Sequence, residues 1–175
     1  MSAEKRLAVT ARILTGLYVI SGDTAMIPLM SKGEEIFAPA EAFEKWTEIL
    51  MNVFSNSAKK MFTWAKETFN ITVKDAIGAA NLENVTCKLL QGPELQFEIV
   101  EASKERAIVR YTHCMWWERY KKFEFERVLI PCDSVDQAWT DAGLTAINPK
   151  LTYKVTKAKP RGDPYCEFVF EFKEK

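Results

Sequence analysis

The chain is poor in histidine and carries no excess of either charge. It has 175 residues with a single histidine, and its 24 lysine and arginine residues equal its 24 aspartate and glutamate residues. One histidine excludes any metal site that needs two imidazoles. Because a nucleic-acid-binding surface usually leaves a basic excess, we expect no nucleic-acid partner.

Familiar catalytic motifs and long hydrophobic runs are also missing. The sequence contains no GxSxG, P-loop, GxGxxG or HExxH motif. The apolar run from Ile13 to Gly22 is only about half the length of a membrane span. No signal-peptide cleavage site follows that run, so we expect no membrane partner and a cytoplasmic location. Thiols stay reduced there, and disulfides are not expected among Cys87, Cys114, Cys132 and Cys166.

What is present is typical of a folded domain. Hydrophobic residues make up 47% of the chain and charged residues 27%, which excludes the disordered, collagen and coiled-coil classes. The length suits one domain that spans residues 1–175.

The first half of the chain carries helical patterns. Apolar residues recur every three or four positions over 2–20 and over 39–69, and Pro39 suits a first helical turn. A third helix follows the capping segment that ends at Asp75, and Gly92 with the following proline ends it. Residues 1–92 are therefore predicted to be mainly helical.

The second half carries strand patterns. Residues 134–142 are predicted to form a short helix closed by Gly143. Two hairpins flank that helix, because residues typical of strands cover 94–101, 106–114, 151–158 and 166–173. This order predicts an α+β fold in which an antiparallel four-stranded sheet is packed by the N-terminal helices.

The thiols and the lone imidazole form the first candidate site. His113 and Cys114 end one predicted strand, Cys166 begins another, and Cys132 lies where a loop meets a helix. If these points converge, the side chains would suit Zn²⁺ or an iron–sulfur cluster. Alternatively, a protonated His113 would lower the pKa of a nearby thiol, Cys132 or Cys166, and create a nucleophile. Simple packing of buried thiols stays open as a third interpretation.

Aromatic residues supply the second candidate site. With 11 phenylalanines, 5 tryptophans and 5 tyrosines, the chain could line a mostly apolar pocket for a small organic molecule. Arg110 or Arg119 could bind a ligand carboxylate through paired hydrogen bonds. The alternative is that the rings fill the core and the arginines are surface charges. The candidate ring contacts are Trp46, Trp64, Trp116 and Trp117.

The C-terminal turn and strand carry a family resemblance. The segment from Thr156 to Phe168 contains Gly162-Asp163 and then Cys166, and it resembles the end of aminothiazoline-carboxylate hydrolase-like proteins. The same segment is similar to the end of the vinyl-reductase-type hydrocarbon-binding domain. Cys114 after a strand and Cys132 before a helix also resemble the first group.

The resemblance implies a fold, a ligand and a metal. The fold would be the ligand-binding architecture shared with nitric-oxide-signalling and Golgi-transport domains, with a small and often aromatic molecule held between helices and sheet. Some members hold a structural zinc near the C-terminal turn with cysteines and an acid. This sequence has Thr156 and Lys157 where those members have a further cysteine, so such a site would need Cys114, Cys132 or His113.

Three functions follow as expectations. The leading one is a domain that binds a small aromatic or heterocyclic ligand. The second is a ring-opening C–N hydrolase of the aminothiazoline-carboxylate type, in which Cys132 or Cys166 attacks, or a bound metal activates water, while His113 moves protons. The third is an assembly or scaffold subunit that uses an apolar helix face. In each case we expect a homodimer.

Overall fold

The computed structural model describes residues 39–122 and 132–173. The helix predicted at 2–20 lies outside these ranges. The helices are α2 (Pro39–Thr68), α3 (Ala76–Gln91), α4 (Met115–Lys122) and α5 (Cys132–Ile147). The strands are β1 (Gln96–Ala102), β2 (Arg106–His113), β3 (Leu151–Lys157) and β4 (Cys166–Phe172), and a short 3₁₀ turn covers Lys159–Arg161.

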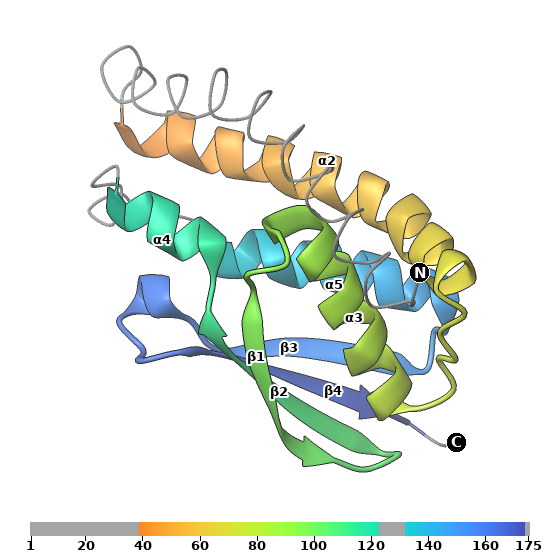
Figure 1. The fold of residues 1–175 in the computed structure, drawn as a ribbon. Helices are drawn as coiled ribbons and strands as arrows, with labels where there is room; N and C mark the ends of the chain where they lie inside the picture. The colour runs from red at the N-terminus through yellow and green to blue at the C-terminus, as the bar shows by residue number, and fades with distance from the viewer. Residues whose placement is uncertain (1–38, 123–131, 174–175) are drawn as a thin grey trace.

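The four strands form one antiparallel sheet in the order β1-β2-β4-β3. Each hairpin stays together, and β2 joins β4 at the centre, where Tyr111 lies opposite Cys166. Both outer strands have irregular register, β1 at two points and β3 at one. The helices lie on one face of the sheet (Figure 1). The predicted class, an antiparallel four-stranded sheet packed by helices, is confirmed.

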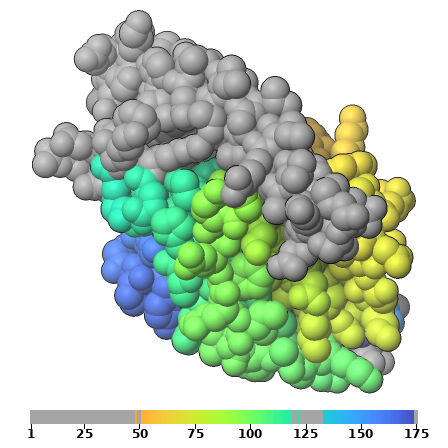
Figure 2. Space-filling model, in the orientation of Figure 1, coloured from red at the N-terminus to blue at the C-terminus, as the bar shows by residue number. Residues whose placement is uncertain are grey.

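The core fills the space between the sheet and the helices. Helix α2 packs along α5, and the fully buried ring of Phe62 meets Trp139 edge-on at 5.8 Å. Helix α3 lies beside the β1–β2 hairpin (Figures 1 and 2). The helix-facing side of the sheet is made of side chains that are at most 5% exposed, namely Ala107, Val109, Tyr111, Tyr153, Phe168 and Phe170.

Helix α3 begins and ends where the sequence predicts. The Asp75 carboxylate accepts a hydrogen bond of 2.9 Å from the backbone N–H of Gly78, which satisfies one free donor of the first turn. Gly92 follows the helix with a φ of 108°, a conformation that favours glycine. These two signals set where α3 begins and where it ends.

Helix α5 differs from its prediction. Gly143 was expected to close a helix over 134–142, but α5 runs through it to Ile147. A Cβ atom at position 143 would lie 2.5 Å from the ring of Phe62, so glycine is there to let α2 approach α5. A single-sequence pattern cannot separate that role from a helix end.

Helix α4 forms where the sequence shows no clear pattern. The apolar residues of 115–125 follow neither a helical nor a strand period, yet Met115–Lys122 forms α4 directly after β2. In the described part of the chain, no helix is long and apolar enough to cross a membrane.

Candidate functional site

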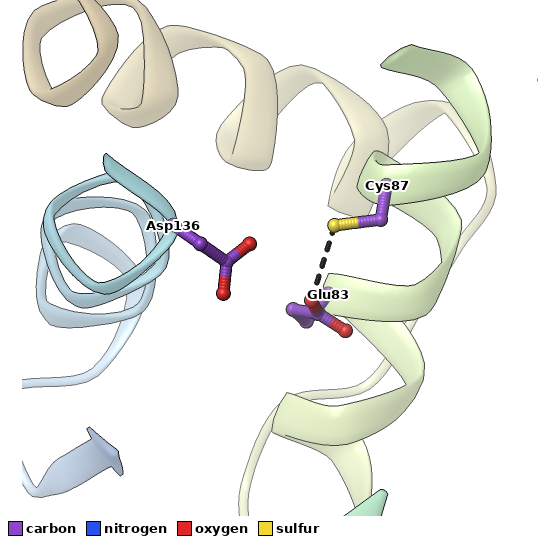
Figure 3. Close-up of side chains that lie close together, drawn as sticks. All are labelled: Glu83, Cys87 and Asp136. Atoms are coloured by element: carbon purple, nitrogen blue, oxygen red, sulfur yellow. Dashed lines mark hydrogen bonds between the residues drawn. The ribbon is translucent and has the colours of Figure 1, made fainter. Parts of the chain in front are cut away.

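A group of polar side chains is buried where α3 and α5 meet the sheet. Glu83 and Cys87 lie one turn apart on α3, and Asp136 points toward them from α5 (Figure 3). The potential ligand atoms of these three residues lie within 4.8 Å of one another. Tyr111 of β2 and Tyr153 of β3 add their hydroxyls to the same group. We call these five residues the acid–phenol cluster.

Hydrogen bonds connect the side chains of the cluster, but they do not satisfy all of its polar atoms. Oε1 of Glu83 accepts from the Tyr111 hydroxyl at 2.7 Å and from the Cys87 thiol at 3.1 Å. The Tyr153 hydroxyl donates to Oδ2 of Asp136. No described residue forms a hydrogen bond with Oε2 of Glu83, although that oxygen is buried. A buried polar atom without a partner is costly, and such atoms call for a specific explanation.

The two acids have strongly raised pKa values. Burial, and then the nearby Asp136, raise the pKa of Glu83 from 4.5 to about 8. Burial likewise raises the pKa of Asp136 from 3.8 to about 7, although the Tyr153 hydroxyl opposes this, and Asp133 and Asp141 add to it. The pair therefore holds protons near neutral pH, which is typical of functional sites.

The sequence of α3 explains why an acid is buried there. Glu83 is the only carboxylate in this helix, and it stands among small and apolar residues such as Ala79, Ala80 and Leu82, all nearly fully buried. The sequence patterns do not single out Glu83, Cys87 or Asp136 as site residues. The available signal was one acid on an apolar helix with a thiol one turn later. Asp136 is far away in sequence, so only the fold reveals it as the third member.

Three of the predicted thiol and imidazole residues, His113, Cys114 and Cys166, lie at the end of β2 that is opposite to the hairpin turn. His113 ends β2 half-buried, and Cys114 follows it, with its thiol 3.1 Å from Oε1 of Gln91. The Cys166 sulfur accepts a hydrogen bond from the backbone N–H of Lys159 at 3.4 Å. Cys114 and Cys166 lie close enough for the charge of one to oppose ionisation of the other.

These residues do not assemble the predicted metal set by themselves. Among the described residues, only Glu83, Cys87 and Asp136 bring three potential ligand atoms together at this spacing. The side chain of Cys132, at the start of α5, lies outside what the structure describes. A zinc or iron–sulfur site completed by Cys132 therefore stays a prediction.

Burial shapes the reactivity of the described thiols. It raises the pKa of Cys114 to about 11 and also raises the pKa values of Cys87 and Cys166. A thiol nucleophile needs a lowered pKa, so these surroundings favour the protonated thiol instead. Among the described residues, the partners of the Cys114 and Cys166 sulfurs are Gln91 and Lys159, and neither sulfur is hydrogen-bonded to His113, the predicted proton carrier.

The predicted ligand-contact residues are spread over several surfaces. Trp64 is 42% exposed, and Trp116 on α4 meets Phe54 edge-on at 5.9 Å. Trp117 is half-buried in the same helix. The side chains of Trp46 and Arg119 lie outside the described part.

Arg110 is already engaged by protein groups. Its Nε donates to Oε2 of Glu167 at 2.7 Å, and its guanidinium stacks on the ring of Tyr165 at 4.6 Å. Arg110 alternates with the buried Val109 and Tyr111, so it faces away from the helices. It therefore does not belong to the acid–phenol cluster.

Comparison with solved structures identifies the fold. The chain is similar to the phenol-responsive sensory domain of the transcription activator PoxR, solved with phenol, with a TM-score of 0.55 and 8% identity. That match covers 98% of this chain and 75% of the other. It is also similar to a trafficking protein particle complex subunit 3 from Naegleria fowleri covalently bound to palmitic acid, with a TM-score of 0.52 and 8% identity over 93% and 97% of the two chains.

These matches bear on the predicted resemblance. They confirm its fold, an α+β architecture in which helices pack on an antiparallel four-stranded sheet. No protein-family model matches the chain, and no curated protein matches its sequence. The hydrolase part of the resemblance therefore stays a prediction.

Proposed function

We propose that this chain is a ligand-binding domain that holds a small aromatic or heterocyclic molecule between its helices and sheet. The polar end of the molecule would meet the acid–phenol cluster. One observation carries this proposal. Oε2 of Glu83 is a buried carboxyl oxygen, and no described residue forms a hydrogen bond with it. A ligand hydroxyl or amine would satisfy it.

Aromatic rings beside the cluster support an aromatic ligand. The rings of Tyr111 and Phe168 meet at 4.6 Å, and Tyr153 stacks on Phe168 at 5.8 Å. Phe97 extends this group, with its ring 6.4 Å from Tyr111. Such rings favour a flat apolar partner through edge and face contacts. The two tyrosines direct their hydroxyls to the acids, so ring and polar contacts lie side by side.

Charge narrows the class of ligand. The cluster contains two carboxyl groups and no cationic side chain, so nothing in it would offset the cost of burying an anionic ligand. A neutral carboxyl group at Glu83 can both donate and accept a hydrogen bond. We therefore infer that phenols and aromatic amines bind better than aromatic carboxylates, which departs from the predicted carboxylate contact at Arg110. Two structural neighbours that hold small molecules agree with a ligand-binding role.

A thermal-shift and calorimetry screen tests this proposal. The full chain is treated with EDTA and screened with phenol, catechol and aniline against benzoate. A ligand at a hundred times its dissociation constant stabilises the fold by about 2.7 kcal/mol. We expect this for a phenol or an amine, and a loss of at least tenfold in affinity for Glu83→Gln or Tyr111→Phe.

A matched control separates the cluster from general charge effects. Glu98→Gln makes the same carboxyl-to-amide change in a side chain that is 57% exposed, and it should bind like the unchanged protein. Equal binding of benzoate and phenol, or no shift with any ring compound, would contradict the proposal. Unchanged affinity in Glu83→Gln would exclude the cluster as the site.

A further inference from the structure

Three side chains with metal-binding atoms converge inside the protein. Glu83 and Cys87 are four residues apart on α3, so they share one helix face, and Asp136 approaches from α5 (Figure 3). Their donor atoms lie within 4.8 Å of one another, and the Cys87 sulfur is 3.1 Å from Oε1 of Glu83. Two helices thus supply three ligands from fixed backbone positions.

These distances suit a small divalent ion. Zinc holds oxygen donors at about 2.0–2.2 Å and thiolates at about 2.3 Å, so donors around a tetrahedral ion lie about 3.3–3.8 Å apart. The three donor atoms lie within 4.8 Å of one another, so an ion would draw them closer by at most about 1.5 Å. One thiolate with two carboxylates is a mixed donor set that zinc accepts and that magnesium and calcium disfavour.

A buried polar atom indicates that the cluster takes up a further group. Oε2 of Glu83 has no hydrogen-bond partner among the described residues, and Glu83 is fully buried. Native structures leave few such atoms, and an ion is one of the groups that satisfy them.

We propose that Glu83, Cys87 and Asp136 bind one divalent transition-metal ion, with zinc as the best fit. Binding releases the thiol proton and any carboxyl proton to solvent, and the ion then offsets two of the three buried negative charges. The hydroxyls of Tyr111 and Tyr153 donate to the two carboxylates and hold them in orientation, as outer partners of metal ligands do. A fourth coordination position stays open.

This site is distinct from the metal set predicted from the sequence. That set comprised His113, Cys114, Cys132 and Cys166, which lie at the end of β2, the start of α5 and the start of β4. Metal binding at this site does not depend on the organic ligand proposed above, and it is measured with no organic molecule present.

Cobalt binding tests the inference directly. The full chain is stripped with EDTA, exchanged into chelator-free buffer at pH 8 and titrated with Co²⁺. A cobalt–thiolate bond gives a charge-transfer band in the near ultraviolet. We expect one equivalent of Co²⁺, a band that Zn²⁺ abolishes by competition, and no band in Cys87→Ser. The isosteric Glu83→Gln should weaken binding by at least tenfold.

A matched thiol control completes the design. Cys114→Ser also replaces a buried thiol, but one outside the cluster, and it should keep the band and the affinity. Circular dichroism of each variant reports whether the fold is retained, and if Cys87→Ser fails to fold, Glu83→Gln decides the case. No band in the unchanged protein, or a band that survives Cys87→Ser and disappears in Cys114→Ser, would overturn the inference. Phenol shifts measured in EDTA decide the proposed function separately.

Discussion

Replacing Glu83 by glutamine should stabilise the protein in alkaline solution and leave its stability nearly unchanged in acid. The Glu83 carboxyl titrates near 4.5 in an unfolded chain and near 8 in the fold, because it is buried and faces Asp136 of α5. Between these values, the folded protein holds a proton that the unfolded chain has lost. The free energy of unfolding therefore falls as the pH rises from about 4.5 to about 8.

The expected size follows from the same values. At 1.36 kcal/mol per pKa unit, the difference between about 8 and 4.5 sets an upper bound of about 5 kcal/mol. Asp136 shares the proton equilibrium, so we expect about 2–3 kcal/mol from Glu83 alone. Glutamine resembles the protonated acid, and its Oε1 can still accept from Tyr111 and Cys87.

Urea unfolding between pH 5 and pH 9, followed by tryptophan fluorescence with EDTA present, measures the effect. The curve of the unchanged protein should fall with pH, and that of Glu83→Gln should fall less. The remaining slope comes from Asp136, whose pKa is about 7 in the fold, and ends near that pH. Glu98→Gln, at an exposed position, should follow the unchanged protein. A free energy of unfolding that stays constant or rises from pH 5 to pH 8.5 would refute the reasoning.

Three further substitutions test the fold by urea unfolding. Gly143→Ala should lower the free energy of unfolding by about 1–2 kcal/mol, because the added methyl group meets the Phe62 ring. This clash outweighs the preference of helices for alanine. A more stable variant would contradict the close packing of α2 on α5. Asp75→Ala should cost about 1 kcal/mol through loss of the α3 cap, and an unchanged midpoint would argue against that cap. Arg110→Met leaves the largely buried Glu167 carboxylate without its closest cation, so we expect a loss of about 1–2 kcal/mol at pH 7. Burial opposes ionisation of Glu167, but Arg110 helps to lower its pKa below 4.5, so this loss should shrink as the pH falls below that value.

Local signals explain why much of the fold was predictable. Pro39 starts α2, Asp75 caps α3, and the alternation from Cys166 onward forms β4 as predicted. Each signal acts through neighbours in sequence, so the sequence alone reveals it. The turn residues between the strands predicted the two hairpins. The structure adds the order in which the two hairpins join in the sheet.

The candidate site depended on contacts that no local pattern contains. Glu83 resembles any acid on a helix until β2 and α5 bury it beside Tyr111 and Asp136. Gly143 resembles a helix end until Phe62 of α2 lies against it. In both cases the deciding partner comes from a distant segment. The charge on Glu83 and the size of residue 143 are fixed by tertiary packing and not by periodicity.

The irregular outer strands have a consequence for how copies of this protein can meet. An outer strand with free backbone groups invites a strand from another molecule, and kinks together with lysine side chains discourage that addition. Here β1 is interrupted between Gln96 and Phe97 and again between Ile99 and Glu101, while β3 is interrupted before Lys157. Growth of the sheet from one molecule into the next is therefore hindered on both sides, which favours contacts through the helices, or through the sheet face that the described helices leave uncovered, for any homodimer.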